Sequence, residues 1–530
     1  MKEQYAKAIE VAQKFKIADR LCASGFFITD TETDLFPKML ESWKVRKYRG
    51  WVFYTHPEQR LFIEQVTDGE ALFLIGHAYN PFTLEADEQA ILREAVKAKK
   101  QGYQTYLKYI NSLTGVFIMG QVCDDRILVL LDCAGMMSGF YGTINNITVV
   151  TSHTVIPSIM FNLKKSEYVN KLLSYRFYKL YGNYLPGDIS PYKEIRRIVP
   201  NTWVSICKKD KKATIKRFFP DRELVQVCDQ EYDDHITKIA NVLGSTMALI
   251  AKKWKIPAIS LTGGMDSKTT LSAARHCYDS FKYFSYITSK AERIDAEAAR
   301  IISASVNVEH KIYDISDDPN KCEMFDAVRR VLEFNCDFVG VPNSNDVCKR
   351  AFFANNNDFD IEVKSWVSEI ARANYYKKFG KKRMPKDISP RRCSSMYKFF
   401  LHNRKLLYET DGIFLEYIQK TQLQENLNNY DWSDMFLWEI RYGSWGGLVL
   451  TSEHKYSFDI TVPYNNRELL RLMLAVPLEK RRKDDLHRDL IAKMNPEVDM
   501  PGITITNLNE TKFREICEKL YFNINSWLPF

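Results

Sequence analysis

The spacing of apolar residues divides the chain into two regions with different periods. Up to about residue 225, short runs of β-branched and aromatic residues alternate with turn residues, a pattern typical of strands. The runs cover residues 51–54, 71–75, 115–119, 127–131 and 147–150, and a helical pattern over residues 86–97 separates two of them. The mixture predicts a layered α+β region with antiparallel sheets.

The period changes from Tyr232 onward. Apolar residues at 236, 239, 240, 243, 247 and 250 form one face of a predicted helix. Strand-like runs at 256–261, 283–287 and 310–313 then alternate with helical patterns at 268–277 and 295–303. This alternation predicts a parallel sheet with right-handed crossovers, followed by a helix-rich last third. A polar hairpin at 208–216 and a linker near 220–230 place the domain boundary between residues 225 and 226.

Composition narrows the class of protein. The chain has 530 residues, 45% hydrophobic and 27% charged, which predicts a globular protein of two or three domains. Its net charge of +9 allows anionic small substrates and does not require nucleic acid. No apolar run approaches the ~18 residues of a membrane helix. The eleven dispersed cysteines form no Cys-x-x-Cys pair and the start is no signal peptide, so we expect a cytoplasmic protein.

Residues 260–267, Ser-Leu-Thr-Gly-Gly-Met-Asp-Ser, carry the strongest chemical signal. They follow an apolar run and lead into a predicted helix. Glycines let backbone N–H groups approach a polyphosphate, and the start of a helix adds partial positive charge. Asp266 and the hydroxyl groups of Thr262 and Ser267 are oxygen donors suited to Mg²⁺ and pyrophosphate. The sequence therefore predicts a phosphate-binding turn at the end of a buried strand.

The same residues resemble the Ser-Gly-Gly-x-Asp-Ser loop of the N-type ATP pyrophosphatases, with Thr262 in place of the first serine. Those enzymes split ATP into AMP and pyrophosphate. Residues 284–285, 295–300 and 309–310 resemble the second βαβ unit of asparagine synthetase and β-lactam synthetase. The resemblance implies ATP and Mg²⁺ as cofactors and an open pocket at the strand ends. It implies these cofactor-binding residues: Leu261, Thr262, Gly263, Gly264, Asp266, Ser267, Phe284, Ser285 and Arg300, with backbone groups of Leu261 and Phe284 at the adenine.

For two residues, Arg300 and Glu369, an ordinary structural role is the alternative to a role in ligand binding. Arg300 could equally belong to a solvated helix face. Glu369 is the residue in 363–370 that matches the family's Ser-Gly-x-Gly-x-Asp-Glu turn, so Asp266 and Glu369 are the implied metal ligands. The alternative is that Glu369 pairs with Arg372 one helical turn later.

The resemblance also implies catalytic residues. Residues 483–488 are similar to the family's Lys-x-x-Leu-Arg stretch, which makes Lys483 the expected cation at the transition state, with Arg481, Arg482 and Arg488 as rivals. β-Lactam synthetase uses a Tyr–Glu dyad as its base in the second step. Glu439 and Tyr442 are the corresponding candidates here, and Glu369 is also included in the expected catalytic set.

The first half resembles, more weakly, the amidotransferase half of the same family. Residues 76–80, 113–117, 131–135 and 190–200 carry this likeness. The chain begins Met1-Lys2-Glu3, so the N-terminal cysteine nucleophile of those glutaminases is missing and Cys22 is the first thiol. The resemblance implies an Ntn-hydrolase-like αββα sandwich over residues 1–225 without glutaminase activity. It implies an adenine-nucleotide α-hydrolase-like synthetase domain over residues 226–530.

These observations lead to one main hypothesis and three rivals. The main hypothesis is an ATP-dependent, AMP- and pyrophosphate-forming ligase that joins a small-molecule carboxylate to an amine or ammonia. The rivals are an asparagine synthetase-like amidotransferase acting on a sugar-acid or surface-polysaccharide precursor, a tRNA-modifying ATP pyrophosphatase with the basic run 377–392 as footprint, and a non-catalytic nucleotide-binding scaffold. We expect no membrane partner, regard nucleic acid as the weaker alternative, and leave a homodimer open.

Overall fold

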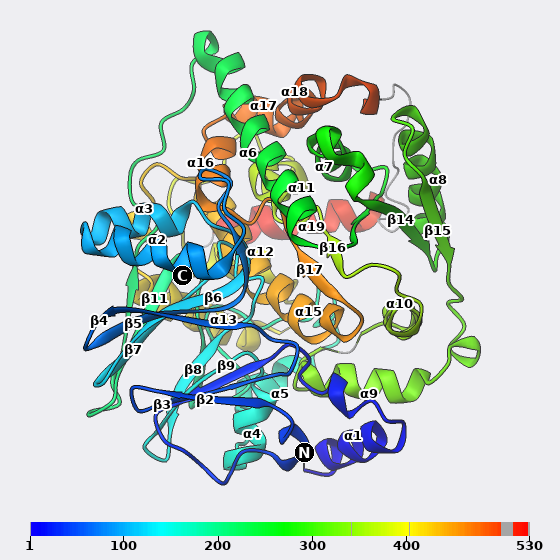
Figure 1. The fold of residues 1–530 in the computed structure, drawn as a ribbon. Helices are drawn as coiled ribbons and strands as arrows, with labels where there is room; N and C mark the ends of the chain where they lie inside the picture. The colour runs from blue at the N-terminus through cyan, green and yellow to red at the C-terminus, as the bar shows by residue number, and fades with distance from the viewer. Residues whose placement is uncertain (1, 341, 402, 500–511, 528–530) are drawn as a thin grey trace.

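Two antiparallel sheets form the first half of the molecule in the computed structural model, which describes residues 2–340, 342–401, 403–499 and 512–527 (Figure 1). Their strand orders are β10-β8-β9-β1-β3-β2 and β12-β11-β7-β6-β5-β4. The first sheet contains β1 (Phe26–Thr29), β2 (Lys44–Tyr48), β3 (Trp51–Thr55), β8 (Phe140–Ile144), β9 (Ile147–Thr151) and β10 (Ile195–Arg197). The second contains β4 (Leu61–Thr67), β5 (Glu70–Tyr79), β6 (Thr114–Cys123), β7 (Arg126–Leu131), β11 (Thr202–Cys207) and β12 (Ala213–Arg217).

The two sheets pack face to face and helices cover their outer sides. Phe53 of the first sheet contacts Phe73 of the second, with ring centroids 5.3 Å apart. Helices α2 (Glu88–Lys100) and α3 (Tyr103–Asn111) lie over the second sheet, while α4 (Val155–Phe161) and α5 (Glu167–Leu173) lie below the first in Figure 1. Strand β5 is buried over nearly all of its length because it lies between helices and the other sheet. The predicted mixture of antiparallel sheets and helices is confirmed.

A parallel sheet forms the centre of the second half, in the order β15-β14-β13-β16-β17. All its neighbouring strands pair in parallel. The strands are β13 (Pro257–Ser260), β14 (Lys282–Ile287), β15 (His310–Asp314), β16 (Ile361–Val363) and β17 (Asp459–Thr461). The strand order turns outward in both directions from β13, and this reversal is where open α/β sheets bind ligands. The first three strands were predicted. The last two have three residues each and were not.

Helices surround this sheet and make up most of the last third, as expected. Helix α6 buries the predicted face that includes Ile236, Leu243 and Ile250. The others are α7 (Met265–Ala273), α8 (Lys290–Ser305), α9 (Phe325–Asn335), α10 (Ser344–Asn355), α11 (Asn374–Lys378), α12 (Pro390–Tyr397), α13 (Arg404–Lys420), α14 (Trp432–Phe436), α15 (Gly447–Ser452), α16 (Arg467–Leu474), α17 (Leu478–Arg482), α18 (Asp485–Met494) and α19 (Lys512–Trp527), with α6 at Tyr232–Lys253 and α1 at Lys2–Lys14. Helix α14, the π-helix η8 (Leu437–Gly446) and α15 follow one another without a break.

Buried polar contacts join the two halves. Glu439 of η8 is fully buried and its Oε2 lies 3.0 Å from Nη2 of Arg217 in β12. The side-chain amide of Asn465 donates to the carbonyl of Gly115 at 2.6 Å and to Asp132 Oδ1 at 2.9 Å. A π-helix is rare and here places Glu439 against the first half. The two halves therefore share a polar core and not only an apolar one.

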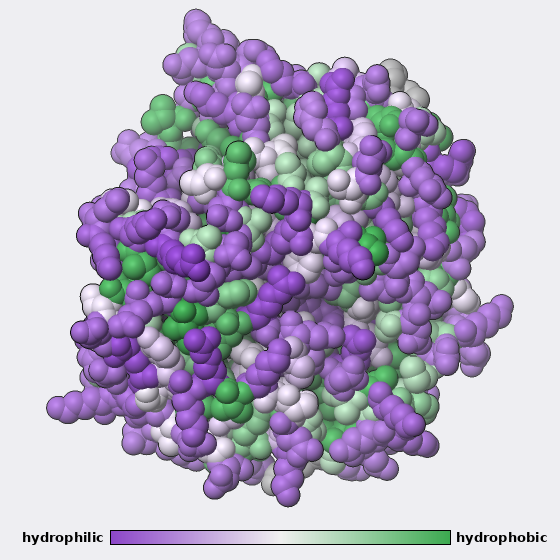
Figure 2. All heavy atoms as spheres, viewed as in Figure 1, coloured by the Kyte–Doolittle hydropathy of each residue, from purple (hydrophilic) through white to green (hydrophobic). Residues whose placement is uncertain are grey.

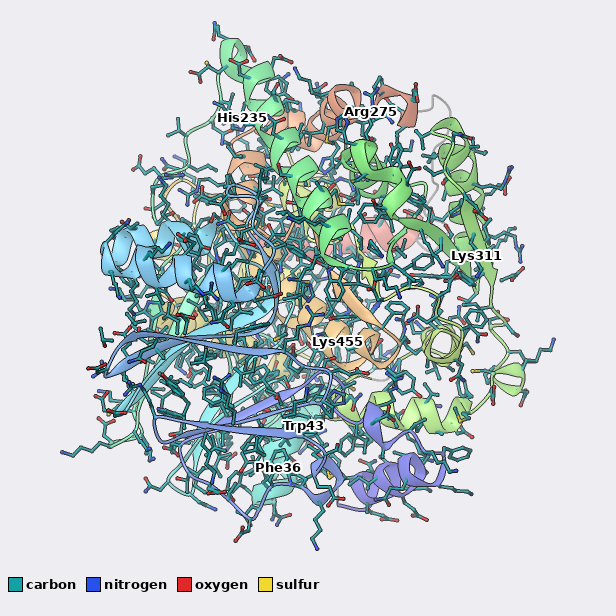
Figure 3. All side chains as sticks on the ribbon, viewed as in Figure 1. Phe36, Trp43, His235, Arg275, Lys311 and Lys455 are labelled. Carbon is teal, nitrogen blue, oxygen red and sulfur yellow. The ribbon has the colours of Figure 1, made fainter. Side chains whose placement is uncertain are left out.

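A second polar link lies closer to the centre of the molecule. Lys455, labelled in Figure 3 between the lower sheets and the upper parallel sheet, pairs with Asp459 at 3.4 Å. Asp459 Oδ2 in turn lies 3.7 Å from Nδ1 of His77 in β5. The parallel sheet is thus tied to the second antiparallel sheet through its edge strand β17.

The visible face is mainly polar, with small scattered apolar areas (Figure 2). In the part of the chain that the structure describes, we find no helix with the length and apolarity that crossing a bilayer requires.

Candidate functional site

The glycine turn connects β13 to α7. The N–H of Thr262 donates to Ser267 Oγ at 3.0 Å, and the N–H of Gly264 donates to Thr262 Oγ1 at 3.2 Å. A Cβ atom at Gly264 would lie 3.3 Å from the same hydroxyl, closer than most such contacts. Glycine therefore lets this turn stay compact. The two hydroxyl oxygens accept hydrogen bonds from N–H groups that could otherwise donate to a phosphate.

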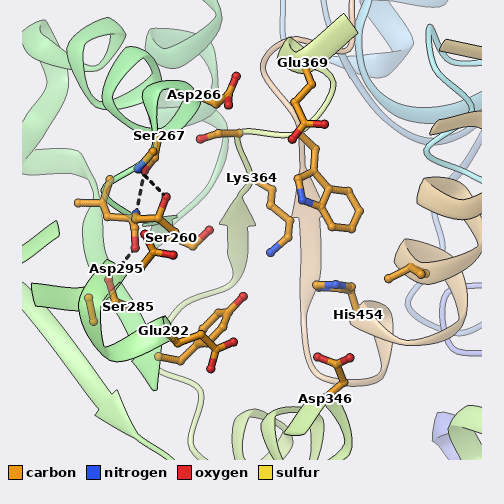
Figure 4. A pocket seen from close by; sticks show the side chains of 18 of the residues that line it. Ser260, Asp266, Ser267, Ser285, Glu292, Asp295, Asp346, Lys364, Glu369 and His454 are labelled. Carbon is orange, nitrogen blue, oxygen red and sulfur yellow. Dashed lines mark hydrogen bonds between the residues drawn. The ribbon is translucent and has the colours of Figure 1, made fainter. Parts of the chain in front are cut away.

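The turn lines a recess of about 410 Å³ (Figure 4). The other walls come from β14 at Ser285, from α8 at Asp295, from α10 at Asp346 and Arg350, from the segment after β16 and from residues 445–454. This volume is within the ~300–1,000 Å³ usual for small-ligand sites. The recess lies at the carboxyl ends of β13, β14 and β16, at the point where the strand order reverses.

Asp266 lies on the wall of this recess and its side chain is 18% exposed. Its carboxylate accepts a hydrogen bond from Ser368 Oγ at 2.6 Å and forms a short ion pair with Arg372. Arg372 also donates to Asp484 at 2.8 Å. The alternative in which Glu369 pairs with Arg372 is wrong, because the guanidinium lies between Asp266 and Asp484 instead.

Glu369 opens into the same recess and forms a different pair. The hydroxyl of Tyr442 donates to Glu369 Oε2 at 3.1 Å. Loss of hydration among the surrounding residues, together with the Asp266 carboxylate, raises the pKa of Glu369. Glu369 therefore lines the recess as part of a Tyr–Glu pair whose tyrosine, Tyr442, is buried behind it. The predicted partner, Glu439, does not belong to this pair, because its carboxylate is buried against Arg217 at the junction of the halves.

Lys483 lies outside the lining of the recess. It follows the last residue of α17 with its side chain exposed, and the next residue, Asp484, turns the chain with a φ of +63°. Two cations of the described residues line the recess, Arg350 of α10 and Lys364, which directly follows β16 and has its Nζ 2.9 Å from Glu362 Oε1 (Figure 4). The available signal was a lysine after the alternating residues Ile361-Glu362-Val363, but three residues are too few to recognise as a strand.

The residues expected at the adenine are distributed differently. The N–H of Leu261 already donates to the carbonyl of Phe284 at 2.8 Å, and the Phe284 ring is buried against Phe359. Ser285 and Leu261 do line the recess, and Ser285 Oγ donates to the Leu261 carbonyl at 2.6 Å. Arg300 is exposed and pairs with Glu297 on α8, which matches the solvated-face alternative.

Carboxylates outnumber cations in the recess. Besides Asp266 and Glu369 it receives four acidic side chains, Glu292, Asp295, Asp346 and Glu453. Among the described residues, no cluster of three or more His, Cys, Asp or Glu side chains suits a metal ion. The assignment of Asp266 and Glu369 as metal ligands stays a prediction.

Two other sequence features have structural roles. Cys22 is fully buried, its N–H donates to Asn335 Oδ1 at 2.8 Å, and burial raises the pKa of its thiol. In the basic run 377–392, Lys377 pairs with Asp484 and Arg391 with Asp411. These charges are used inside the molecule, and only part of the run faces outward.

Neither a protein-family model nor a curated protein matches this chain. Among solved structures, the glutamine phosphoribosylpyrophosphate amidotransferase of B. subtilis, complexed with ADP and GMP, aligns at 14% identity over 53% of this chain, with a TM-score of 0.23. The chain spans 64% of that protein's length. A structure described as the allosteric regulatory enzyme of purine biosynthesis aligns at 11% identity over 64% of this chain and 90% of its own, with a TM-score of 0.25.

Proposed function

We propose that this chain is an ATP- and Mg²⁺-dependent ligase of the asparagine synthetase and β-lactam synthetase type. It activates a carboxylate by adenylation and joins the acyl group to an amine. The proposal rests chiefly on one observation: the glycine turn lies at the reversal of the parallel sheet and shares a recess with Lys364 and Glu369. In this proposal the first half is an Ntn-hydrolase-like sandwich that supports the synthetase half.

In the first step, a carboxylate oxygen of the acid attacks the α-phosphorus of ATP. The bond between the α-phosphorus and the bridging oxygen breaks, and pyrophosphate leaves with the electron pair. When ATP binds, the hydroxyls of Thr262 and Ser267 turn from the N–H groups of the turn to the leaving group, and the freed N–H groups hold it as well. Lys364 offsets the negative charge that develops on the α-phosphate, a role that requires a fixed cation.

In the second step, the amine attacks the acyl carbon and AMP leaves. After pyrophosphate has left, Glu369 Oε1 is the acceptor for the amine proton while Tyr442 holds Oε2. A carboxylate with a raised pKa is a better base for this transfer than an ordinary one.

The donor set also fits Mg²⁺. Asp266 is close enough to Glu369 that its carboxylate disfavours the charged form of Glu369, which a divalent cation relieves. These two residues would hold the ion, and when bound it would neutralise phosphate charge.

The test measures products from ATP, Mg²⁺ and a panel of carboxylic acids, with hydroxylamine as the trapping amine. We expect AMP and pyrophosphate in equal amounts together with a hydroxamate, and loss of all three in Asp266→Asn. The matched control is Asp279→Asn, because Asp279 is exposed in η4 (Arg275–Ser280) and should leave the yield unchanged. Release of ADP and phosphate, or no product with any acid, would reject the proposal.

The glutamine-fed rival is less well supported. A buried thiol with a raised pKa is a poor nucleophile, so Cys22 does not supply ammonia in this proposal. The amine or ammonia then comes from solution. The tRNA rival loses support for a related reason, since Lys377 and Arg391 of the basic run are bound internally.

A further inference from the structure

Arg350 of α10 is a buried cation without a carboxylate partner. Its side chain lines the recess, the residue is 3% exposed, and its Nη1 lies 3.1 Å from Nδ1 of His454. Burial, together with the charge of Arg350, lowers the pKa of His454 well below its usual value, so the imidazole is neutral. Among the ion pairs of the described residues, none involves Arg350.

The carboxyl groups near Arg350 do not supply the missing charge: Asp346 pairs with Lys349 at 3.5 Å, and Glu453 holds a proton. Burial, and then the neighbouring Asp346, raise the pKa of Glu453 to about 8, so this group is mostly uncharged at pH 7. A buried guanidinium that lacks an anion is costly, and Arg binds carboxylates through paired, charge-assisted hydrogen bonds. A ligand anion in the recess would complete this site.

An apolar wall lies beside Arg350. Trp445, Val449 and Glu453 are spaced four residues apart along η8 and α15, and all three line the recess. Trp366, from the segment after β16, lies against Trp445 with ring centroids 5.6 Å apart and an angle of 35° between the rings. Two indole rings in one small pocket favour a flat apolar ligand.

We propose that this wall is the subsite of the acid substrate, an organic carboxylate attached to an aromatic or similarly apolar body. Arg350 receives the carboxylate, and the body lies against Trp366, Trp445 and Val449. Lys364 lies between Ser267 of the glycine turn and His454 in Figure 4, where a bound acid would approach the α-phosphate. The inference rests on the proposed function for the chemistry of that acid, while binding itself does not require ATP.

The binding test uses the fluorescence of the protein's tryptophans and needs no nucleotide. We expect 3-phenylpropionate to quench it saturably. Succinate lacks the aromatic ring and the neutral 3-phenylpropanamide lacks the carboxylate, so each should bind at least ~10-fold more weakly. Trp366→Phe should reduce the amplitude of quenching. Arg350→Gln should weaken binding ~10-fold or more and Arg350→Lys less, because lysine keeps the charge without the paired geometry.

The matched control is Arg293→Gln, since Arg293 is an exposed arginine of α8 that pairs with Asp314. It should bind 3-phenylpropionate as the unchanged protein does. If both Arg350 variants fail to fold, Trp366→Ala takes their place. It should raise the KM for 3-phenylpropionate ~10-fold and leave the KM for ATP unchanged.

The outcomes separate this inference from the proposed function. Saturable binding of 3-phenylpropionate that depends on Arg350, without pyrophosphate release, would support the subsite and reject the ligase. Pyrophosphate release that is equal with acetate, succinate and 3-phenylpropionate, and indifferent to Arg350 and Trp366, would overturn the subsite and leave the ligase intact. Absence of any binding by 3-phenylpropionate would also overturn the subsite.

Discussion

Single residues in the recess owe their roles to partners that are distant in sequence. Asp266 is held by Ser368 and Arg372, about a hundred residues later, and Glu369 is held by Tyr442. The motif in the sequence identifies the turn but none of these partners. A side chain can therefore be assigned to the site from sequence while its protonation and charge balance cannot.

Two lysines test where the catalytic cation lies. Lys364→Ala should lower kcat for pyrophosphate release by about 100-fold, or ~3 kcal/mol, because it removes a fixed charge from the recess. Lys483→Ala should change kcat less than ~2-fold, since an exposed lysine is well solvated. The measurement is kcat and KM for ATP and acid in both variants. The reverse order of effects would restore the assignment made from sequence.

Glu453 gives a prediction for stability against pH. Its folded pKa of about 8 lies above the ordinary 4.5, so between these values the folded state holds a proton that the unfolded state has lost. Its contribution is complete below pH 4.5 and is lost as the pH rises through 8. The groups that face it are Asp346 and Arg350 of α10 and the Cys336 thiol.

Glu453→Gln removes this titration. The melting temperature of the variant should therefore fall less between pH 6 and pH 9 than that of the parent protein, by a few degrees. Parallel melting curves for the two proteins at matched ionic strength measure the difference. Identical pH dependence in both would show that Glu453 titrates normally.

At the scale of elements, long patterned segments were predictable and short ones were not. The alternating runs gave β3, β5, β6, β7 and β9 of the antiparallel sheets, and the apolar period gave α6. Strands β16 and β17 have three residues each and pair with partners about a hundred or more residues away, so local sequence carries almost no record of them. Lys364 and Trp366 were missed for the same reason, because they follow β16.

The turn between β13 and α7 offers a prediction at this scale. A methyl group at position 264 would press on Thr262 Oγ1 at 3.3 Å and displace the N–H groups that receive phosphate. Gly264→Ala should raise the KM for ATP roughly 10-fold, or ~1.4 kcal/mol, with little change in melting temperature. Gly412→Ala is the control, because no atom lies within 4 Å of its new methyl group. Equal KM values for the two variants would mean that the turn does not hold ATP.

The whole molecule depends on the junction between its halves. Arg217 and Glu439 form a buried pair that also involves Asn201 and Tyr417. The proposed boundary at residue 225 stays a prediction, but the contacts that cross it are clear. The sequence could not reveal these contacts, because the identity of a glutamate does not say whether it is buried or which residue it pairs with.

Breaking the Arg217–Glu439 pair should strongly destabilise the folded protein. Glu439→Gln should lower the free energy of unfolding by about 3–5 kcal/mol, because Arg217 would stay buried without its anion. Glu297→Gln, which breaks an exposed pair with Arg300, should leave the free energy of unfolding almost unchanged, because both side chains stay solvated. Denaturant unfolding of both variants measures the difference, and the KM for ATP should stay unchanged in each. Similar losses in the two would show that the junction contributes little.

The hydrogen bonds of Asn465 limit how this chain could evolve. Its side-chain amide bonds to backbone and carboxylate atoms of Gly115, Asp132 and Ala134, so this part of the second half depends on hydrogen-bond partners in the first half. A shorter protein without residues 1–225 would have to replace all the hydrogen-bond partners of the Asn465 side chain at the same time. Gradual truncation of residues 1–225 would therefore be strongly disfavoured, even if that half has no activity of its own.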